Sequence, residues 1–169
     1  MTKIIRKDTL VLVTKSGQQI LLGLKKRGFG CGKWNGFGGK VEMNETIEEA
    51  AKRELLEESN LKCNDMKKVG ILSFEFVNDL TAPKHLEIHV FHTEDYWGEV
   101  QESDEMMPKW FNIEDIPFNN MWVEDHLWFQ LLLKGSRFRG FFKYSGQSII
   151  TEYILQELSK ECKLDPIEY

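Results

Sequence analysis

Three glutamates, Glu54, Glu57 and Glu58, lie within one short acidic segment of the 169-residue chain. Residues three and four positions apart share a face of an α-helix, so a helix here would make the three carboxylates neighbours. Neighbouring carboxylates repel one another, and a bound cation relieves that repulsion. Oxygen ligands of this kind favour hard divalent cations such as Mg²⁺ or Mn²⁺. The spacing is therefore compatible with a metal site that handles an anionic substrate.

The same segment also has a simpler explanation as a solvated helix surface. Glu48 and Lys52 are four residues apart, as are Glu49 and Arg53, and both pairs could form ion pairs along an exposed face. On the helix alone this explanation is favoured, because such charge patterns are common on exposed helices. The residues that precede the helix reverse the preference.

A glycine-rich stretch precedes this acidic segment. Residues 36–39 read Gly-Phe-Gly-Gly, and glycines permit positive φ and let the backbone approach a phosphate or a metal closely. The helix itself is expected from Thr46 to about Asn60, because Thr46 followed three residues later by Glu49 makes a capping box. Sequence order thus predicts a glycine loop that leads into an acidic helix.

The glycine loop and the helix together follow one fixed spacing, carried by Gly39, Glu45, Arg53, Glu54, Leu55, Glu57, Glu58 and Leu61. This pattern resembles the Nudix box, written G-x5-E-x7-R-E-U-x-E-E-x-G-U, where U is a bulky apolar residue. Every specified position matches except Asn60, where the family usually has glycine. Asparagine tolerates the left-handed conformation that ends helices better than most residues, so we expect the helix to stop there.

The resemblance implies a division of roles within the box. The implied ligands for Mg²⁺, with Mn²⁺ as a possible substitute, are Gly38, Glu54, Glu57, Glu58 and, from a separate segment, Glu102. Arg53 would orient a carboxylate, either Glu45 or a metal-binding glutamate. The metal would neutralise a polyphosphate and activate water for in-line attack on phosphorus, with Glu57 or Glu58 taking the proton. Glu102 is equally compatible with an exposed loop acid.

The resemblance extends to the animal MutT-homologue branch of the family, over residues 22–30, 34–41, 74–77, 102–106 and 121–122. It implies hydrolysis of oxidised purine nucleoside triphosphates, notably 8-oxo-dGTP and 2-hydroxy-dATP, to monophosphate and pyrophosphate. Such a reaction removes damaged precursors from the nucleotide pool and so prevents DNA damage. The substrate-binding residues implied by position are Thr9, Lys25, Phe29, Asn35, Phe74, Leu86, Trp122, Glu124 and Asp125.

The chemistry of these side chains suits a purine. Two close carboxyls, Glu124 and Asp125, tend to share a proton and can donate or accept, and Asn35 adds an amide. Trp122 can stack on a base, which contributes about 1–3 kcal/mol in nucleic-acid sites. Singly, an aromatic side chain is more often a core residue, and two acids at a helix start are favoured by the dipole. Because Glu124 stands where the branch has aspartate, the ranking of guanine and adenine substrates stays open.

Hydrophobic patterning predicts the elements that would position these residues. Strands are expected at 9–14 and 19–24, joined as a hairpin across 15–18, and at 69–77, 86–92 and 107–111, with a turn at 117–120. A helix is expected at 124–134, and a final hairpin at 137–143 and 148–155, whose last segment could also be helical. The pattern predicts an α+β domain, and the resemblance implies a Nudix fold with a mixed central β-sheet sandwiched between helices.

Composition limits the remaining function classes. A 169-residue chain with 41% hydrophobic residues fits one globular domain over 1–169, and a net charge of −5 disfavours a nucleic acid polymer as partner. Three scattered cysteines, no signal-peptide core and no membrane-spanning run favour a cytoplasmic protein, with mitochondrial or nuclear pools open. We expect a monomer with a small nucleotide substrate and no membrane contact.

Two other functions compete with this expectation. The first is a Nudix hydrolase of a different diphosphate, such as a dinucleoside polyphosphate or a nucleotide sugar, which the match at the base-binding positions disfavours. The second is a nucleotide-binding module that no longer turns over. Glu54, Glu57 and Glu58 are all retained, which favours an enzyme over that module.

Overall fold

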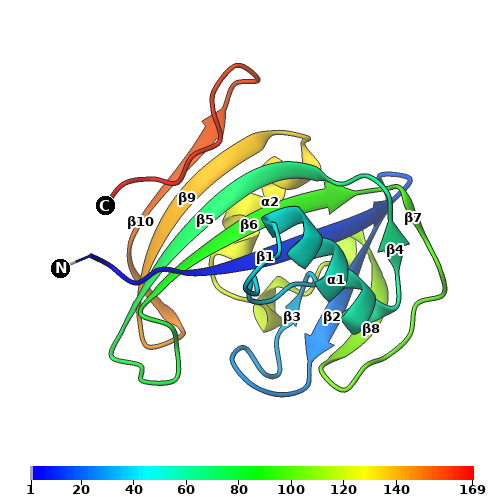
Figure 1. The fold of residues 1–169 in the computed structure, drawn as a ribbon, viewed down its shortest axis with the longest axis horizontal. Coiled ribbons are helices and arrows are strands. Elements are labelled where there is room, and N and C mark those ends of the chain that lie inside the picture. Colours follow the sequence, from blue (N-terminus) through cyan, green and yellow to red (C-terminus); the bar gives the residue numbers. More distant parts are fainter. Residues whose placement is uncertain (1) are drawn as a thin grey trace.

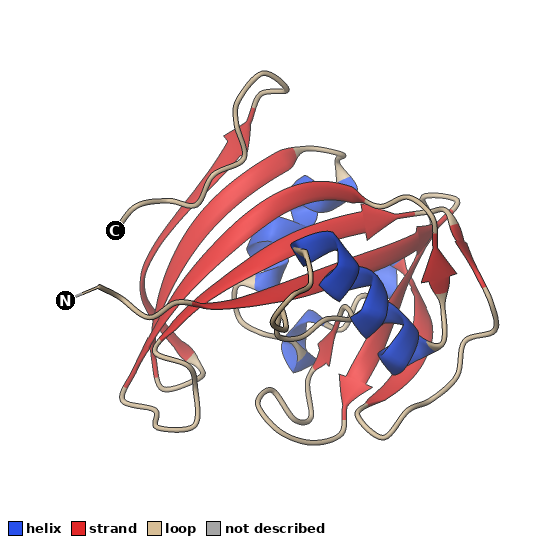
Figure 2. Ribbon diagram, in the orientation of Figure 1, coloured by secondary structure: helices blue, strands red, loops and turns tan. Residues whose placement is uncertain are grey.

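The computed structural model describes residues 2–169, and strands dominate it (Figures 1 and 2). The strands are β1 (Arg6–Lys15), β2 (Gln19–Lys25), β3 (Trp34–Asn35), β4 (Lys62–Cys63), β5 (Lys67–Val77), β6 (His85–Thr93), β7 (Tyr96–Trp97), β8 (Met106–Asn112), β9 (Arg137–Ser145) and β10 (Ile149–Leu158). The helices are α1 (Ile47–Ser59), α2 (Asp125–Leu133) and the short 3₁₀ helices η1 (Ile113–Asp115) and η2 (Phe118–Asn120). The predicted α+β class is confirmed.

The central sheet is mixed, as predicted. Its eight strands run in the order β10-β9-β5-β6-β1-β2-β3, and β8 also pairs with β2. The β1–β6 and β5–β9 pairs are parallel, whereas the other pairs in this sheet are antiparallel. A small separate sheet joins β4 to β7. The parallel pairings bring strands that are far apart in sequence to the middle of the sheet.

The two α-helices cover opposite faces of the sheet, and alternation along β1 explains how. Successive strand residues point to opposite faces, so Leu12 packs in one core cluster with Trp128 of α2. Val11 packs in the other cluster with Leu55 of α1. Figure 1 shows α1 in front of the sheet and α2 behind it. The expected arrangement of a sheet between helices is confirmed.

Helix α1 begins and ends where its sequence predicts. The Thr46 hydroxyl accepts a hydrogen bond from the Glu49 amide at 3.1 Å, and the Glu49 carboxylate accepts one from the Thr46 amide at 2.7 Å. Asn60 adopts the left-handed conformation with φ 65°, and its side chain donates to the Glu99 carbonyl at 2.8 Å. The asparagine therefore replaces the usual glycine without loss of the helix stop.

The hairpins at the two ends of the sequence are also present. β1 pairs with β2 through Val13 and Leu21, and β9 pairs with β10 along its whole length. The helical alternative for 148–155 was wrong, because those residues extend the sheet edge beside β9. The two-residue strands β3, β4 and β7 were missed, since two residues are too short to show any periodicity.

Within residues 2–169, α1 and α2 are both too short to cross a membrane, and no other helix there is long and apolar enough. Cys31, Cys63 and Cys162 are free thiols.

Candidate active site

The three box glutamates of α1 occupy different environments. Glu58 is 3% exposed, and its Oε1 accepts a hydrogen bond from the Gly38 amide at 2.8 Å. The Glu54 side chain is 14% exposed, whereas that of Glu57 is 58% exposed. One face of the helix therefore carries carboxylates that range from buried beneath the glycine loop to open to solvent.

Arg53 ties these carboxylates to the segment before the helix. Its guanidinium donates to both oxygens of Glu45, at 2.7 and 3.0 Å, and to the Lys40 carbonyl at 3.1 Å. It also donates to Glu54 at 3.0 Å and to Glu57 at 3.3 Å. The hydrogen bond with Arg53 lowers the pKa of Glu45 to about 2. Arg53 thus contacts Glu45 and metal-binding candidates together, where the sequence left a choice between them.

Of the two ion pairs expected for a solvated helix surface, one forms within residues 2–169. Glu48 and Lys52 lie 3.2 Å apart as an exposed pair. Glu49 does not pair with Arg53, because its carboxylate caps the Thr46 amide instead. The glutamates of the box therefore make contacts beyond helix-surface ion pairing.

Close approach, and not positive φ, explains the glycines at 36–39. None of them is among the positive-φ residues of the chain, so this part of the prediction was wrong. A Cβ on Gly38 would lie 1.8 Å from the Thr9 carbonyl oxygen, and one on Gly39 would lie 2.5 Å from Glu54 Oε1. The loop lies against β1, with the Thr9 amide donating to the Gly39 carbonyl at 2.9 Å. Any side chain at Gly38 would push the loop off the strand.

The donor set around this loop fits a hard divalent cation in chemistry. Burial raises the pKa of Glu58 to about 8, and burial also raises the pKa of Glu54. A nearby cation would favour the charged forms of both groups. Among residues 2–169, no three acidic, histidine or cysteine side chains already converge on one cation position. Glu54 and Glu57 are held by Arg53, and Glu58 is held by the Gly38 amide.

The two glutamates of the acidic segment before β8, Glu102 and Glu105, pair with different lysines. Glu102 is half exposed and pairs with Lys26 at 2.5 Å, away from the lining of the cavity described below. Glu105 pairs with Lys25 at 3.4 Å, and its charge raises the pKa of Glu58. Glu102 as a metal ligand therefore stays a prediction, and Glu105 is the acid of this segment whose charge acts on Glu58.

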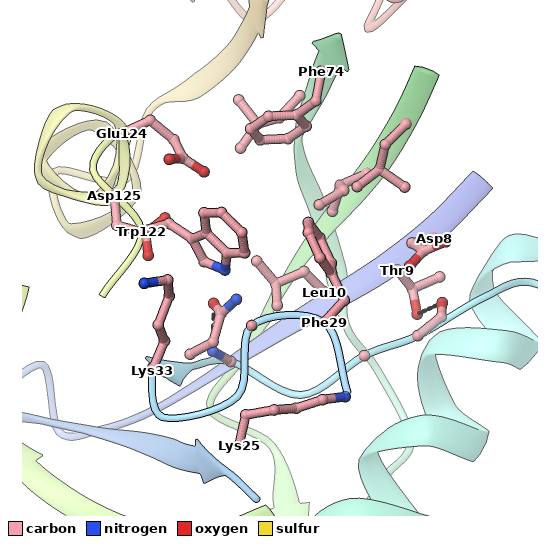
Figure 3. A pocket seen from close by; sticks show the side chains of 18 of the residues that line it. Asp8, Thr9, Leu10, Lys25, Phe29, Lys33, Phe74, Trp122, Glu124 and Asp125 are labelled. Atoms are coloured by element: carbon pink, nitrogen blue, oxygen red, sulfur yellow. Dashed lines mark hydrogen bonds between the residues drawn. The ribbon is translucent and has the colours of Figure 1, made fainter. Parts of the chain in front are cut away.

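A cavity of about 280 Å³ lies beside this cluster (Figure 3). Every substrate-binding side chain implied by the resemblance lines it, namely Thr9, Lys25, Phe29, Asn35, Phe74, Leu86, Trp122, Glu124 and Asp125. Gly38 and Glu58 line it as well. The cavity therefore joins the purine-binding candidates to the glycine loop and to one box glutamate.

Aromatic rings form one wall of the cavity. The rings of Trp122 and Phe29 lie 5.0 Å apart between centroids, and Phe76 lies 6.1 Å from Trp122. The Lys33 ammonium lies 5.2 Å from the centre of the Trp122 ring. A Cβ on Gly30 would reach to 3.4 Å from the Trp122 Nε1 atom, so the loop packs closely on the indole. These contacts hold Trp122 in a fixed orientation at the cavity.

Two buried acids stand at the start of α2 and project into the cavity (Figure 3). Glu124 is 4% exposed and accepts a hydrogen bond from the Tyr144 hydroxyl. Asp125 is 2% exposed; its Oδ1 accepts from Trp128 Nε1 at 3.0 Å, while its buried Oδ2 has no partner within the described residues. Burial raises the pKa of Glu124 to about 7 and that of Asp125 well above its usual range. Burial therefore favours one shared proton on the pair over two negative charges.

Two smaller polar contacts complete the cavity. Asn35 Oδ1 accepts from the Gly36 amide at 2.8 Å, so the NH₂ group is what the Asn35 side chain has left to offer a ligand. Arg6 and Asp8 form a bidentate ion pair at 2.7 and 2.8 Å beside the cavity. Asn35 belongs to β3, whereas Arg6 and Asp8 belong to β1.

Sequence reasoning missed several residues of this site, namely Arg6, Asp8, Lys33, Phe76, Glu105 and Tyr144. Phe76 lies inside the strand predicted at 69–77 and could have been found, because it is two residues from Phe74 and alternate residues of a strand share a face. Tyr144 gave no such signal, since nothing local relates β9 to the start of α2.

Comparisons with known proteins agree with this geometry. The family model described as NUDIX domain matches residues 5–132. Zebrafish (Danio rerio) and mouse (Mus musculus) proteins named oxidized purine nucleoside triphosphate hydrolase are 53% and 51% identical over 150 residues, which cover 89% of this chain and 94% of each relative. A crystal structure of a MutT protein from Bacillus halodurans superposes with a TM-score of 0.77 at 27% identity, covering 89% of this chain and 97% of that one. The chain belongs to the NUDIX family.

Proposed function

We propose that this protein is a Mg²⁺-dependent pyrophosphohydrolase that cleaves oxidised purine nucleoside triphosphates, including 8-oxo-dGTP and 2-hydroxy-dATP, to the monophosphate and pyrophosphate. One observation supports the proposal most strongly: the cavity lined by Trp122 and the two buried acids Glu124 and Asp125 is also lined by Gly38 of the glycine loop and by Glu58. A purine could stack on Trp122 while its phosphates reach α1. The zebrafish and mouse relatives carry the name of this activity.

Hydrolysis of the phosphate chain would use the residues of α1 and the glycine loop. Glu54, Glu57, Glu58 and the Gly38 carbonyl would hold Mg²⁺, or Mn²⁺ in its place. The cation would neutralise the polyphosphate and lower the pKa of a water molecule. Glu58 or Glu57 would take the proton from that water as it attacks phosphorus and the bond between the first two phosphate groups breaks. Arg53 would keep the carboxylates in position through its five donors.

Recognition of the purine would use the acid pair at the start of α2. An ionised carboxyl accepts hydrogen bonds, whereas a protonated one donates as well. Glu124 and Asp125 can therefore match the polar edge of a purine that presents both a donor and an acceptor. The reaction would remove oxidised precursors from the nucleotide pool. We expect the enzyme to be a monomer that acts in the cytoplasm or on the mitochondrial or nuclear pools.

Binding of the product monophosphate tests the base pocket separately from the metal and the triphosphate. We expect 8-oxo-dGMP to bind at least about tenfold more tightly than dGMP in calorimetry with EDTA present, since a tenfold difference needs only ~1.4 kcal/mol of extra contact. An oxidised pyrimidine monophosphate serves as the control and should bind weakly. Equal dissociation constants for the three ligands would contradict a pocket for oxidised purines and favour a different nucleoside diphosphate substrate.

A further inference from the structure

The Tyr144 hydroxyl lies where the two buried acids of the pocket meet the central sheet. Tyr144 comes from β9, is fully buried, and donates to Glu124 Oε2 at the start of α2. Its ring stacks on Phe76 at 5.3 Å and meets the edge of Trp122 at 6.0 Å. Packing on both sides fixes the hydroxyl against the Glu124 carboxyl.

The two acids consequently differ in their hydrogen bonds. Glu124 has one oxygen occupied by the Tyr144 hydroxyl, which donates to it and stabilises its charged form. Asp125 accepts from Trp128 with one oxygen, and its other oxygen is buried without a partner in the described part of the chain. A buried oxygen without a donor nearby is the natural place for a proton, which then needs an acceptor from a ligand.

The electrostatics of the pocket agree with that placement. Burial raises the pKa of Glu124 to about 7, and the hydrogen bond with Tyr144 acts in the opposite direction. Burial and the charge of Glu124 raise the pKa of Asp125 well above its usual range. Burial and the charge of Glu124 also raise the pKa of Tyr144, so the phenol keeps its proton. Lys33, on the loop before β3, lowers the pKa of both acids.

We propose that Tyr144 is a positioning residue that sets the hydrogen-bond polarity of the base pocket, by holding Glu124 as an acceptor and leaving the shared proton on Asp125. This inference rests on the proposed function. A guanine edge carries the O6 acceptor beside the N1–H donor, which complements a donating Asp125 and an accepting Glu124. An adenine-type edge in the same orientation has a donating amino group at C6, and it would require the proton to move to Glu124. Tyr144 therefore biases the pocket towards oxidised guanine.

The test is Tyr144→Phe, which removes one oxygen and keeps the ring. We expect the ratio of kcat/KM for 8-oxo-dGTP to that for 2-hydroxy-dATP to fall roughly tenfold, the effect of one hydrogen bond to a charged group. The change should lie in KM, with kcat for 8-oxo-dGTP kept within about twofold. Glu124 would also protonate more readily, so the acid limb of the 8-oxo-dGTP pH profile should move to higher pH.

Matched variants separate this role from a structural one. Tyr153→Phe removes a hydroxyl from an exposed tyrosine of β10 and should leave the ratio unchanged. In a Glu124→Gln background, Tyr144→Phe should change the ratio less than about twofold, because the carboxylate through which it acts is gone. An equal effect in both backgrounds would show that Tyr144 acts through packing, and would overturn the inference.

Asp125→Asn provides an independent test should Tyr144→Phe fail to fold. The asparagine amide keeps a donor at the position where Asp125 would carry the proton, so the preference for 8-oxo-dGTP should survive. A switch of preference to 2-hydroxy-dATP would place the proton on Glu124 and overturn the inference. Failure of the two proposals is distinguishable. An unmodified enzyme that hydrolyses neither substrate contradicts the proposed function, whereas an active enzyme with a folded Tyr144→Phe variant of unchanged ratio and pH profile contradicts only the role of Tyr144.

Discussion

Glu58→Gln is expected to reduce nucleoside triphosphate hydrolysis by roughly a thousandfold or more, as removal of a central catalytic group commonly does. Glu58 is the box glutamate that lies beneath the glycine loop and also lines the base cavity. Glutamine keeps an oxygen that can accept from the Gly38 amide, but it loses the negative charge that would bind Mg²⁺ and take a proton. Steady-state turnover at saturating Mg²⁺ measures the loss.

The same variant should not be less stable than the unmodified protein. Burial raises the pKa of Glu58 from an ordinary 4.5 to about 8, so the folded state binds this proton more tightly than the unfolded state does. Ionised Glu58 therefore costs stability as pH rises from about 4.5 to about 8. In EDTA at pH 8, Glu58→Gln should melt at the same or a higher temperature.

Glu48→Gln is the matched control for this experiment. It removes an exposed glutamate of the same helix that forms a surface ion pair with Lys52. Its turnover should stay within about twofold of the unmodified enzyme. Glu58→Gln with normal turnover, or Glu48→Gln with an equally large loss, would contradict the assignment of the metal site.

Trp122→Ala is expected to raise KM for oxidised purine triphosphates by roughly 10- to 100-fold, since base stacking contributes about 1–3 kcal/mol. Trp122 is 9% exposed and packs on Phe29, Phe76 and Tyr144. Truncation should also destabilise the fold by about 3 kcal/mol or more. Initial-rate kinetics below the melting temperature of the variant separate the two effects.

Two further variants control for the loss of packing. Trp122→Phe keeps an aromatic face and should recover most of the stability and part of the base affinity. Trp97→Ala removes an exposed tryptophan of β7 and should change neither. An unchanged KM in a folded Trp122→Ala protein would remove Trp122 from the substrate pocket.

Local rules predicted the elements of this fold well. The capping box of Thr46 and the left-handed Asn60 follow from side-chain hydrogen bonds and backbone sterics within a few residues, so sequence alone determined where α1 begins and ends. The order of strands was beyond such rules, because the parallel pairing of β1 with β6 joins residues about 80 positions apart.

The sequence indicated the site residues that belong to a fixed motif spacing. It missed those that only tertiary packing brings to the site. The box spacing located Arg53 and the glutamates, and all implied base-pocket residues line one cavity. Glu105 was not considered, because a loop has no periodicity that could relate one of its acids to Glu58 of α1. Tyr144 meets Glu124 only through the packing of β9 beneath α2, and no pattern near either residue indicates the other.

The central claim, hydrolysis of oxidised purine nucleoside triphosphates, is tested most directly by pyrophosphate release in Mg²⁺ from 8-oxo-dGTP, 2-hydroxy-dATP, dGTP and dATP, with Glu58→Gln as the blank. We predict that kcat/KM for each oxidised nucleotide exceeds that for its unmodified counterpart by at least about tenfold, and that chelation of the metal stops all release. Equal rates for oxidised and unmodified nucleotides, or release that persists in Glu58→Gln, would contradict this account.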